Sequence, residues 1–390
     1  MKIFINSYTY IYRQHLKMFD FFKNKENLVF ILPKVWKAKG GKIVIMPPEK
    51  SEFKIIKTPA PFYHSHYPII KGMLKGWMPF AGLILKKIAS PGDVLFSSAE
   101  PNLLTTYLYS RLAKRLGLKH VFMTWQNIDY ARRLKGLKLK ITLWLLKQNI
   151  NLSSGALCGT RQAYDILKPY LVGSKIKVTI MPQMGIDTDI FKPGIESNFR
   201  KKYNLENKII FLFCAVFDER KGPFTAIKAF KKVLTQKPDC HLVMIGIGKL
   251  WASAKDLVAK LGMTQNVDFI EWLPNNELPE IFSSVDVLVY PSEPYKDWEE
   301  QYGLTLHEAS ASGLPVISTN IGAISEAILD KETGILVEPK NVDALAEAML
   351  FLANNPAIRA AMGARGREYI LSKHSHKVIA ERLESFLYSL

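Results

Sequence analysis

The stretch from Val289 to Thr319 constrains the fold of this chain more than any other. It opens with a short β-branched and apolar run that ends at Tyr290, passes through a polar loop, and then shows a helical pattern over Leu304–Ser312. Gly313 ends that pattern, and a second β-run follows at Pro315–Ser318. The order strand, loop, helix, strand predicts a parallel sheet with helices packed against it.

Two glutamates lie in this stretch, Glu300 in the loop and Glu308 in the first turns of the expected helix. A carboxylate can bind a pair of neighbouring sugar hydroxyls, which suits one glutamate to a ribose and the other to a hexose. The free N–H groups at the helix start, at Gly303, Leu304 and Thr305, could meet a phosphate. On spacing alone, the commoner interpretation is a solvated loop acid and a favourable helix charge.

The residues after Glu308 read ASASGLPVIST, and with the preceding E-x7-E spacing they resemble the signature of the family-4 retaining glycosyltransferases. Residues 181–193, MPQMGIDTDIFKP, are similar to this family's interdomain motif, and Asn354–Ile370 resembles its penultimate helix. The resemblance implies the α/β fold called GT-B, with two Rossmann-like domains facing across a cleft. We therefore expect an acceptor-binding domain at 1–185, a nucleotide-sugar donor-binding domain at 186–370, and a C-terminal helix at 371–390 that crosses back to the first domain.

The alternation of apolar runs and helical patterns extends toward the N-terminus. We expect further buried strands and one helical stretch there: Lys2–Ser7, Leu28–Leu32, Lys42–Met46 and Asp93–Ser97 as strands, and Tyr12–Phe22 as a helix. These elements predict a parallel sheet for the first domain as well.

The family pattern assigns roles in the donor domain. It implies that Glu308 binds the ribose hydroxyls, that Glu300 binds the transferred sugar, and that Lys221 neutralises the diphosphate. The backbone near Leu273 would meet the base, and Gly248, which closes a G-x-G turn after a β-run, is a further donor-binding candidate.

The chain also departs from the family pattern. The family usually carries an arginine five residues before the lysine, where this chain has Val216, and Arg220 is the candidate substitute. In the first domain, Gln126 stands near the place of a family histidine, which implies a positioning role.

Candidate acceptor or cleft residues follow the expected strands. Ligands in open α/β sheets bind beyond the carboxyl ends of strands, which points to Glu100, Gln126 and Asn127. Helix capping is the alternative role for such residues. The interdomain motif adds Gly185 and Asp187 as cleft residues.

Family membership implies transfer with retention at the anomeric carbon. No carboxylate qualifies as the nucleophile of the glycosidase route, so a same-face displacement is favoured, in which the departing phosphate accepts the acceptor's proton. Metal is not required in this family, no residues have a convincing metal-ligand spacing, and we expect no cofactor besides the nucleoside-diphosphate sugar substrate.

Positive charge is concentrated in the first half of the chain. Up to Asp187 there are 30 Lys and Arg against 9 Asp and Glu, whereas the remainder holds 23 against 26. Lys71–Lys87 and Arg132–Lys147 mix basic with large apolar residues, which indicates contact with an anionic membrane surface, although ordinary packed helices have the same pattern. No leader or spanning run is visible, and the three scattered cysteines fit a reducing compartment. We expect a cytoplasmic protein attached peripherally to the inner face of the cell membrane, acting on a lipid-linked or membrane-surface glycan.

Other classes remain open at this point. A GT-B epimerase or phosphorylase acting on a soluble sugar is the nearest alternative. A basic nucleic-acid-binding protein would explain the positive charge. Such a protein is expected to interleave aromatic side chains with its basic residues as stacking platforms for bases, and this chain does not, so no nucleic-acid partner is expected. A dehydrogenase would need G-x-G-x-x-G after the first strand, which this chain lacks. The donor base, the sugar and the acceptor are not specified by these motifs.

Overall fold

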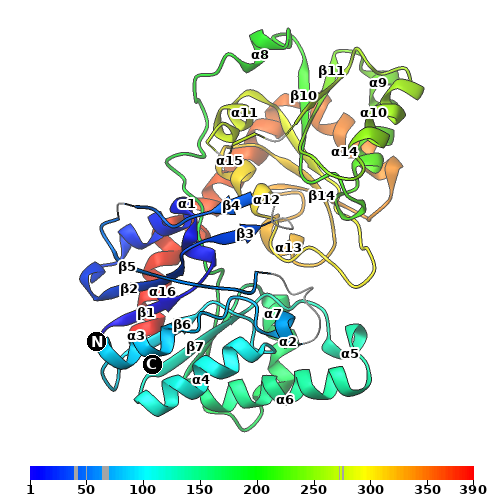
Figure 1. Ribbon diagram of the computed structural model, residues 1–390. Helices are drawn as coiled ribbons and strands as arrows, with labels where there is room; N and C mark the ends of the chain where they lie inside the picture. The colour runs from blue at the N-terminus through cyan, green and yellow to red at the C-terminus, as the bar shows by residue number, and fades with distance from the viewer. Residues whose placement is uncertain (39–42, 50, 64–69, 272, 275) are drawn as a thin grey trace. The chain divides into compact units, whose positions relative to one another are not determined.

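The computed structural model describes residues 1–390 apart from 39–42, 50, 64–69, 272 and 275. The chain divides into two compact units. In Figure 1 the first is coloured blue to green, with a red C-terminal helix, and the second runs from green to orange-red. Unit 1 comprises Met1–Gly185 and His376–Leu390, and unit 2 comprises Ile186–Ser375. Each unit contains one large parallel sheet with helices packed against it.

The sheet of unit 1 has seven strands in the order β5-β2-β1-β6-β7-β8-β9. The strands are β1 Ile3–Asn6, β2 Leu28–Pro33, β5 Lys54–Thr58, β6 Val94–Ser97, β7 Lys119–Thr124, β8 Gly155–Cys158 and β9 Lys177–Ile180. All neighbouring pairs are parallel. The central strands are buried along their whole length, as expected for a sheet covered on both faces.

The α-helices of unit 1 surround this sheet. They are α1 Arg13–Leu16, α2 Ile70–Met73, α3 Ala81–Ile88, α4 Leu104–Leu116, α5 Tyr130–Arg133, α6 Gly136–Leu152, α7 Arg161–Leu167 and α16 His376–Tyr388. Helix α4 packs against both α3 and α6, and the Tyr107 and Trp144 rings lie 5.3 Å apart between α4 and α6. Gly117 ends α4 in the left-handed conformation, with φ of 68°.

Helix α16 belongs to unit 1 although it follows unit 2 in the sequence. Its apolar face, Ile379, Ala380, Leu383 and Leu387, is buried in the same core cluster as Phe30. The expected return of the C-terminal helix to the first domain is therefore present.

Two expectations for the N-terminal region are wrong. Lys42 lies outside the described residues, and β4, Ile43–Ile45, pairs antiparallel with β3, Trp36–Ala38, in a separate two-stranded sheet. In the main sheet, the strand next to β2 is β5 and not residues 43–46. The stretch expected as one helix, Tyr12–Phe22, contains only the short α1 followed by a 3-10 helix at Lys17–Phe21.

The sheet of unit 2 has six parallel strands in the order β12-β11-β10-β13-β14-β15. The strands are β10 Ile209–Cys214, β11 Cys240–Ile245, β12 Val267–Ile270, β13 Val287–Tyr290, β14 Val316–Thr319 and β15 Gly334–Val337. The helices are α8 Phe199–Lys202, α9 Pro223–Gln236, α10 Trp251–Lys260, α11 Leu278–Ser284, α12 Leu304–Ala311, α13 Ile324–Ala327, α14 Val342–Asn354 and α15 Pro356–Lys373.

Alternate residues of β10 contribute to two different apolar clusters of unit 2. Phe211 and Phe213 belong to one cluster, and Ile210 and Leu212 to the other. Successive side chains of a strand point to opposite faces of its sheet, so unit 2 has a core layer on each face.

The strand order of unit 2 reverses between β10 and β13. From β10 the chain proceeds outward to β11 and β12, then returns to β13 and proceeds the other way to β14 and β15. Open α/β sheets bind ligands beyond the carboxyl ends of the strands at such a switch point. A ligand site is therefore expected at the residues that follow Cys214 and Tyr290.

Candidate functional site

The segment after β10 carries Lys221 to the switch point. Asp218 caps the short 3-10 helix Glu219–Lys221 by accepting a hydrogen bond from the Arg220 N–H at 3.0 Å. Gly222 follows with φ of 61°, and a Cβ there would lie 2.2 Å from the Pro291 carbonyl oxygen. A glycine is thus required where the β10 and β13 connections touch.

The Lys221 side chain forms a buried ion pair with Glu300. Their side chains are only 13% and 9% exposed. The Tyr290 hydroxyl joins both groups, since it accepts a hydrogen bond from Lys221 Nζ at 2.5 Å and donates one to Glu300 Oε2 at 3.0 Å. Ser292 Oγ adds a longer contact of 3.3 Å to the same carboxylate oxygen.

These hydrogen bonds explain how the pair tolerates burial. A buried ion pair repays the loss of hydration only when further hydrogen bonds satisfy its members, and Tyr290 supplies them to both. Burial, together with the Glu300 charge, raises the pKa of Tyr290 well above its usual value. The phenol therefore stays protonated and available as the donor to Glu300.

Helix α12 begins immediately after this cluster. Gly303 precedes it with φ of 69°, and a Cβ there would lie 2.6 Å from Leu306 Cδ1. No side chain in the described part of the chain caps the helix start. The first-turn residues Leu304 and Thr305 can thus present N–H groups to an anion.

Glu308 is a second buried carboxyl group in α12, with only 5% of its surface exposed. Burial raises its pKa to about 8. Among the described residues, the Glu308 side chain has no hydrogen bond and no ion pair. The Glu308 carboxylate lies near the end of β10, where burial first and its charge second raise the pKa of Cys214. A buried, unpaired carboxyl at a switch point is a candidate ligand group, because a bound diol would supply the missing hydrogen bonds.

Arg220 and Lys221 both contact Trp298. The Arg220 Cζ lies 4.9 Å and the Lys221 Nζ 5.0 Å from the ring centroid. Arg220 is also ion-paired with Asp218, which balances part of its charge. Val216, where the family carries an arginine, is 40% exposed.

Gly248 and Leu273 serve the local structure of unit 2. A Cβ at Gly248 would lie 2.3 Å from the Phe217 carbonyl oxygen, so this glycine permits close backbone packing. Leu273 is half-buried against an apolar cluster. No hydrogen bond or ion pair joins either residue to the Lys221–Glu300 pair within the ranges that the structure describes.

In unit 1, Glu100, Gln126 and Asn127 gather at the carboxyl end of β7. Thr124 Oγ1 donates to Glu100 Oε2 at 2.8 Å and accepts from the Gln126 N–H at 3.1 Å. The Trp125 N–H also donates to Glu100 at 2.8 Å, and burial raises the pKa of Glu100. Gln126 and Asn127 are both buried.

The interdomain motif falls on the boundary between the two units. Gly185 ends the first segment of unit 1. Asp187 Oδ1 accepts hydrogen bonds from the N–H groups of Asp189 and Ile190, both at 3.3 Å, which stabilises a local turn.

Sequence reasoning missed Tyr290, Ser292 and Trp298. Each lies within eleven residues of Glu300, in the strand end and loop that the motif already contained. A polar residue at the last position of a buried strand was the available signal, because its side-chain tip must find a partner beside the switch point.

Comparisons with known proteins agree with this architecture. Residues 195–369, all within unit 2, match the family described as Glycosyl transferases group 1. The structure of Anabaena HepE in complex with UDP aligns over 100% of both chains with a TM-score of 0.76 at 14% identity. Sucrose-phosphate synthase from Thermosynechococcus elongatus covers 99% of this chain and 98% of its own, with a TM-score of 0.71 at 17% identity.

Curated relatives match about half of the chain. A GDP-mannose-dependent alpha-(1-6)-phosphatidylinositol monomannoside mannosyltransferase from Mycolicibacterium smegmatis is 30% identical over 207 residues, 52% of this chain and 54% of the relative. A D-inositol 3-phosphate glycosyltransferase from Corynebacterium diphtheriae is 28% identical over 233 residues, 57% and 52% of the two chains. The chain thus spans about half the length of the curated relatives it matches.

The two parallel sheets and their structural neighbours define the fold as GT-B. Within it, the match to the glycosyl transferases group 1 family covers the sheet of unit 2, at residues 195–369. No helix in the described residues is both long and apolar enough to cross a bilayer.

Proposed function

We propose that this chain is a retaining glycosyltransferase that moves a hexose from a nucleoside-diphosphate sugar to an acceptor without a metal ion. The observation that carries the proposal is the buried Lys221–Tyr290–Glu300 cluster at the switch point of a glycosyl transferases group 1 domain. A cation, an uncapped helix start and two buried carboxyl groups supply what a diphosphate and two sugar rings require.

The protein's role in the reaction is electrostatic. Lys221 and the first-turn N–H groups of α12 take up the negative charge that develops on the departing diphosphate, in place of a divalent cation. Glu300 accepts hydrogen bonds from the hexose, and Glu308 accepts them from the ribose. The bond from the anomeric carbon to the phosphate oxygen breaks while the acceptor oxygen bonds on the same face. The acceptor's proton passes to the departing phosphate oxygen, so configuration is retained.

The proposed acceptor is a lipid-linked or membrane-surface glycan at the inner face of the cell membrane. The names of two relatives specify a phosphatidylinositol mannoside and an inositol phosphate as acceptors. Unit 1 also holds the basic and apolar segments described above. Between residues 53 and 154 it has 16 Lys and Arg against 3 Asp and Glu, which favours an anionic surface.

Acceptor dependence tests this function. The protein would be incubated with UDP-, GDP- and ADP-sugars, with and without a membrane lipid extract, in the presence of EDTA. Nucleoside diphosphate release only with the extract, together with radiolabelled sugar in the lipid fraction, supports the transferase. Turnover of the donor without acceptor would indicate an epimerase, and turnover that needs inorganic phosphate would indicate a phosphorylase. Loss of activity in EDTA would reject the metal-free mechanism.

A further inference from the structure

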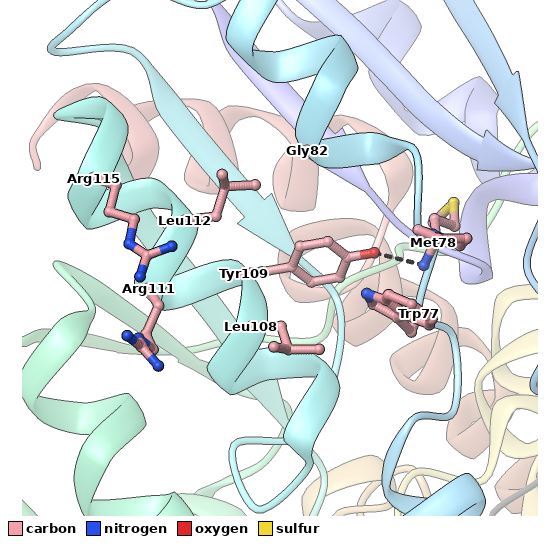
Figure 2. Close-up of a pocket in the computed structure, with 9 residues that line it drawn as sticks. Trp77, Met78, Gly82, Leu108, Tyr109, Arg111, Leu112 and Arg115 are labelled. Carbon is pink, nitrogen blue, oxygen red and sulfur yellow. Dashed lines mark hydrogen bonds between the residues drawn. The ribbon is translucent and has the colours of Figure 1, made fainter.

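Unit 1 contains a pocket that has no part in the reaction proposed above. It lies between helix α4 and the segment that leads into α3, and its volume is about 210 Å³. Its lining residues, which Figure 2 draws with all but Pro79 labelled, are Trp77, Met78, Pro79, Gly82, Leu108, Tyr109, Arg111, Leu112 and Arg115.

The wall of the pocket is held in place by a buried hydrogen bond. The Met78 N–H donates to the Tyr109 hydroxyl at 2.8 Å, which fastens the segment before α3 to α4 (Figure 2). Tyr109 is only 3% exposed, and Met78 only 1%. This wall of the pocket is thus fixed by a buried contact between two elements of unit 1.

One rim of the pocket carries two arginines. Arg111 and Arg115 are exposed and stand four residues apart on α4, so their side chains share one face of the helix, as Figure 2 shows. Neither forms an ion pair with any described residue. The three acidic residues between 53 and 154, Asp93, Glu100 and Asp129, each accept hydrogen bonds from nearby backbone N–H groups.

The rest of the pocket is apolar, and its apolar surface continues outside. Trp77, Leu108 and Leu112 contribute to the lining. Phe80 and Leu83, next to the lining residues of the α3 segment, are 51% and 56% exposed. The Arg111 guanidinium lies 5.5 Å from the centroid of the Tyr107 ring, and neither arginine has an acidic partner within the described ranges. Such groups beside exposed apolar side chains are complementary to a molecule that is anionic at one end and apolar at the other.

We propose that this pocket binds the phosphate headgroup of an anionic phospholipid. Arg111 and Arg115 would bind the phosphate, Trp77 and Leu112 would pack against the glycerol and first methylenes, and the acyl chains would leave past Leu83. The volume is below the roughly 300–1,000 Å³ of sites for drug-sized ligands, which fits a headgroup but not a whole lipid. The proposal rests on the membrane association proposed above, but it does not depend on the transfer reaction.

Short-chain lipids that stay monomeric in solution test the pocket without a membrane surface. Calorimetry would compare dihexanoyl phosphatidylglycerol, dihexanoyl phosphatidylcholine and inorganic phosphate as ligands of the full chain. We expect the anionic lipid to bind at least tenfold more tightly than the other two. Equal binding of inorganic phosphate would mean a bare anion site, and no binding of the anionic lipid would also overturn the proposal.

Matched variants distinguish binding in a defined pocket from a general effect of positive charge. Arg111→Gln/Arg115→Gln should weaken binding of the anionic lipid by at least tenfold, whereas Lys168→Gln/Lys175→Gln, which removes two exposed charges of unit 1 outside both basic segments, should change it by less than twofold. Gly82→Leu should also weaken binding with no change of charge, because a Cβ at Gly82 meets only Leu112 at an ordinary 3.5 Å and the longer side chain would enter the pocket. Equal losses in the lysine control and the arginine variant would contradict a defined site.

A separate readout keeps this proposal distinct from the proposed function. The pocket variants should bind nucleoside diphosphate as the wild type does. Lipid binding with the expected variant pattern but without glycosyl transfer would leave the pocket established and would reject the transferase.

Discussion

The hydroxyl of Tyr290 donates a hydrogen bond to the Glu300 carboxylate, with 3.0 Å between the oxygens. Tyr290 ends β13 and Glu300 lies in the loop that follows, so this bond folds the loop back onto the strand. Because the same hydroxyl accepts from Lys221, it fixes the positions of both charged groups at once. The following predictions depend on this arrangement and on its neighbour Glu308.

Tyr290→Phe should disturb the pair without removing either charge. Loss of a buried hydroxyl that satisfies two partners should lower the free energy of unfolding by about 1–3 kcal/mol. Because Lys221 and Glu300 lose their common partner, kcat should fall by roughly 10- to 100-fold while the donor KM changes much less. Steady-state kinetics would test this, with Tyr295→Phe in the same loop as the control. A kcat equal to that of the control would show that Tyr290 has only a structural role.

Glu300→Gln should lower turnover by about two orders of magnitude or more, since the amide keeps the shape but not the charge that a developing positive centre requires. Glu300 is also buried, so its replacement should affect folding as well as turnover. Its replacement leaves Lys221 buried without a counter-charge, and stability should fall measurably. Glu299→Gln is the neighbouring control. Normal turnover by a folded Glu300→Gln protein would exclude the residue from the site.

Glu308 should make stability depend on pH. Its pKa is about 8 in the folded chain against an ordinary 4.5, so the native state holds this proton more tightly than the unfolded state does. The resulting stabilisation is complete below about pH 4.5 and is lost as the pH rises to about 8. The total loss is on the order of a few kcal/mol.

Denaturant unfolding at several pH values would test this coupling. Glu308→Gln cannot ionise, so it should be more stable than the wild type at pH 8.5, and the difference should shrink toward pH 5. Parallel curves for the two proteins would contradict the assignment. If a ribose diol binds the ionised form, nucleoside diphosphate should also bind more tightly as the pH rises, and this trend should be absent in Glu308→Gln.

Lys221→Ala should weaken nucleoside diphosphate binding by about 10- to 150-fold, the range for one charge-assisted contact of about 1.5–3 kcal/mol. Arg220→Ala should have a smaller effect, because the Arg220 side chain is 37% exposed against 13% for Lys221, so water and salt screen its charge more strongly. Calorimetry with UDP, GDP and ADP would measure both, and Lys228→Ala on α9 is a suitable control. Unchanged affinity in Lys221→Ala would mean that the diphosphate is bound elsewhere.

Membrane binding should depend on both lipid charge and salt. Each basic residue near an anionic bilayer contributes about 1 kcal/mol to binding before screening by salt. At physiological ionic strength this attraction decays with distance from the bilayer over a Debye length of about 8 Å. The protein should sediment with anionic but not neutral liposomes at low ionic strength, and high salt should release it. Protein that stays in the supernatant with anionic vesicles at low salt would make a soluble acceptor the better hypothesis.

Local patterns in the sequence predicted the two parallel sheets well because each buried strand of a parallel sheet is a continuous apolar run, whereas the GT-B class was implied by the family resemblance. The same property explains the misplaced strand. Residues 43–46 and β5 are both short β-branched runs, and only pairing with the distant β2 determines which one joins the main sheet. Tyr12–Phe22 has helical spacing, yet Tyr10, Phe19 and Phe30 pack edge to face nearby, and this tertiary packing accompanies a break into a short helix and a 3-10 turn.

The candidate site was predictable in its residue types but not in its contacts. Glu300, Glu308 and Lys221 could be selected from their motif positions. Their burial, the ion pair between Lys221 and Glu300 and the isolation of Glu308 follow from the reversal of strand order between β10 and β13, which brings residues 79 positions apart into contact. Single-sequence patterns do not specify such pairings.

Helix α16 makes unit 1 discontinuous in the sequence, whereas unit 2 is one uninterrupted segment. A gene fragment that stopped at Gly185 would encode the seven-stranded sheet without Ile379, Leu383 and Leu387, and would leave part of its core exposed to water. The segment Ile186–Ser375 contains all the members of its own two apolar clusters. In evolutionary recombination, unit 2 can therefore be exchanged between genes as a single insert, while unit 1 can be inherited intact only with both of the segments that flank it.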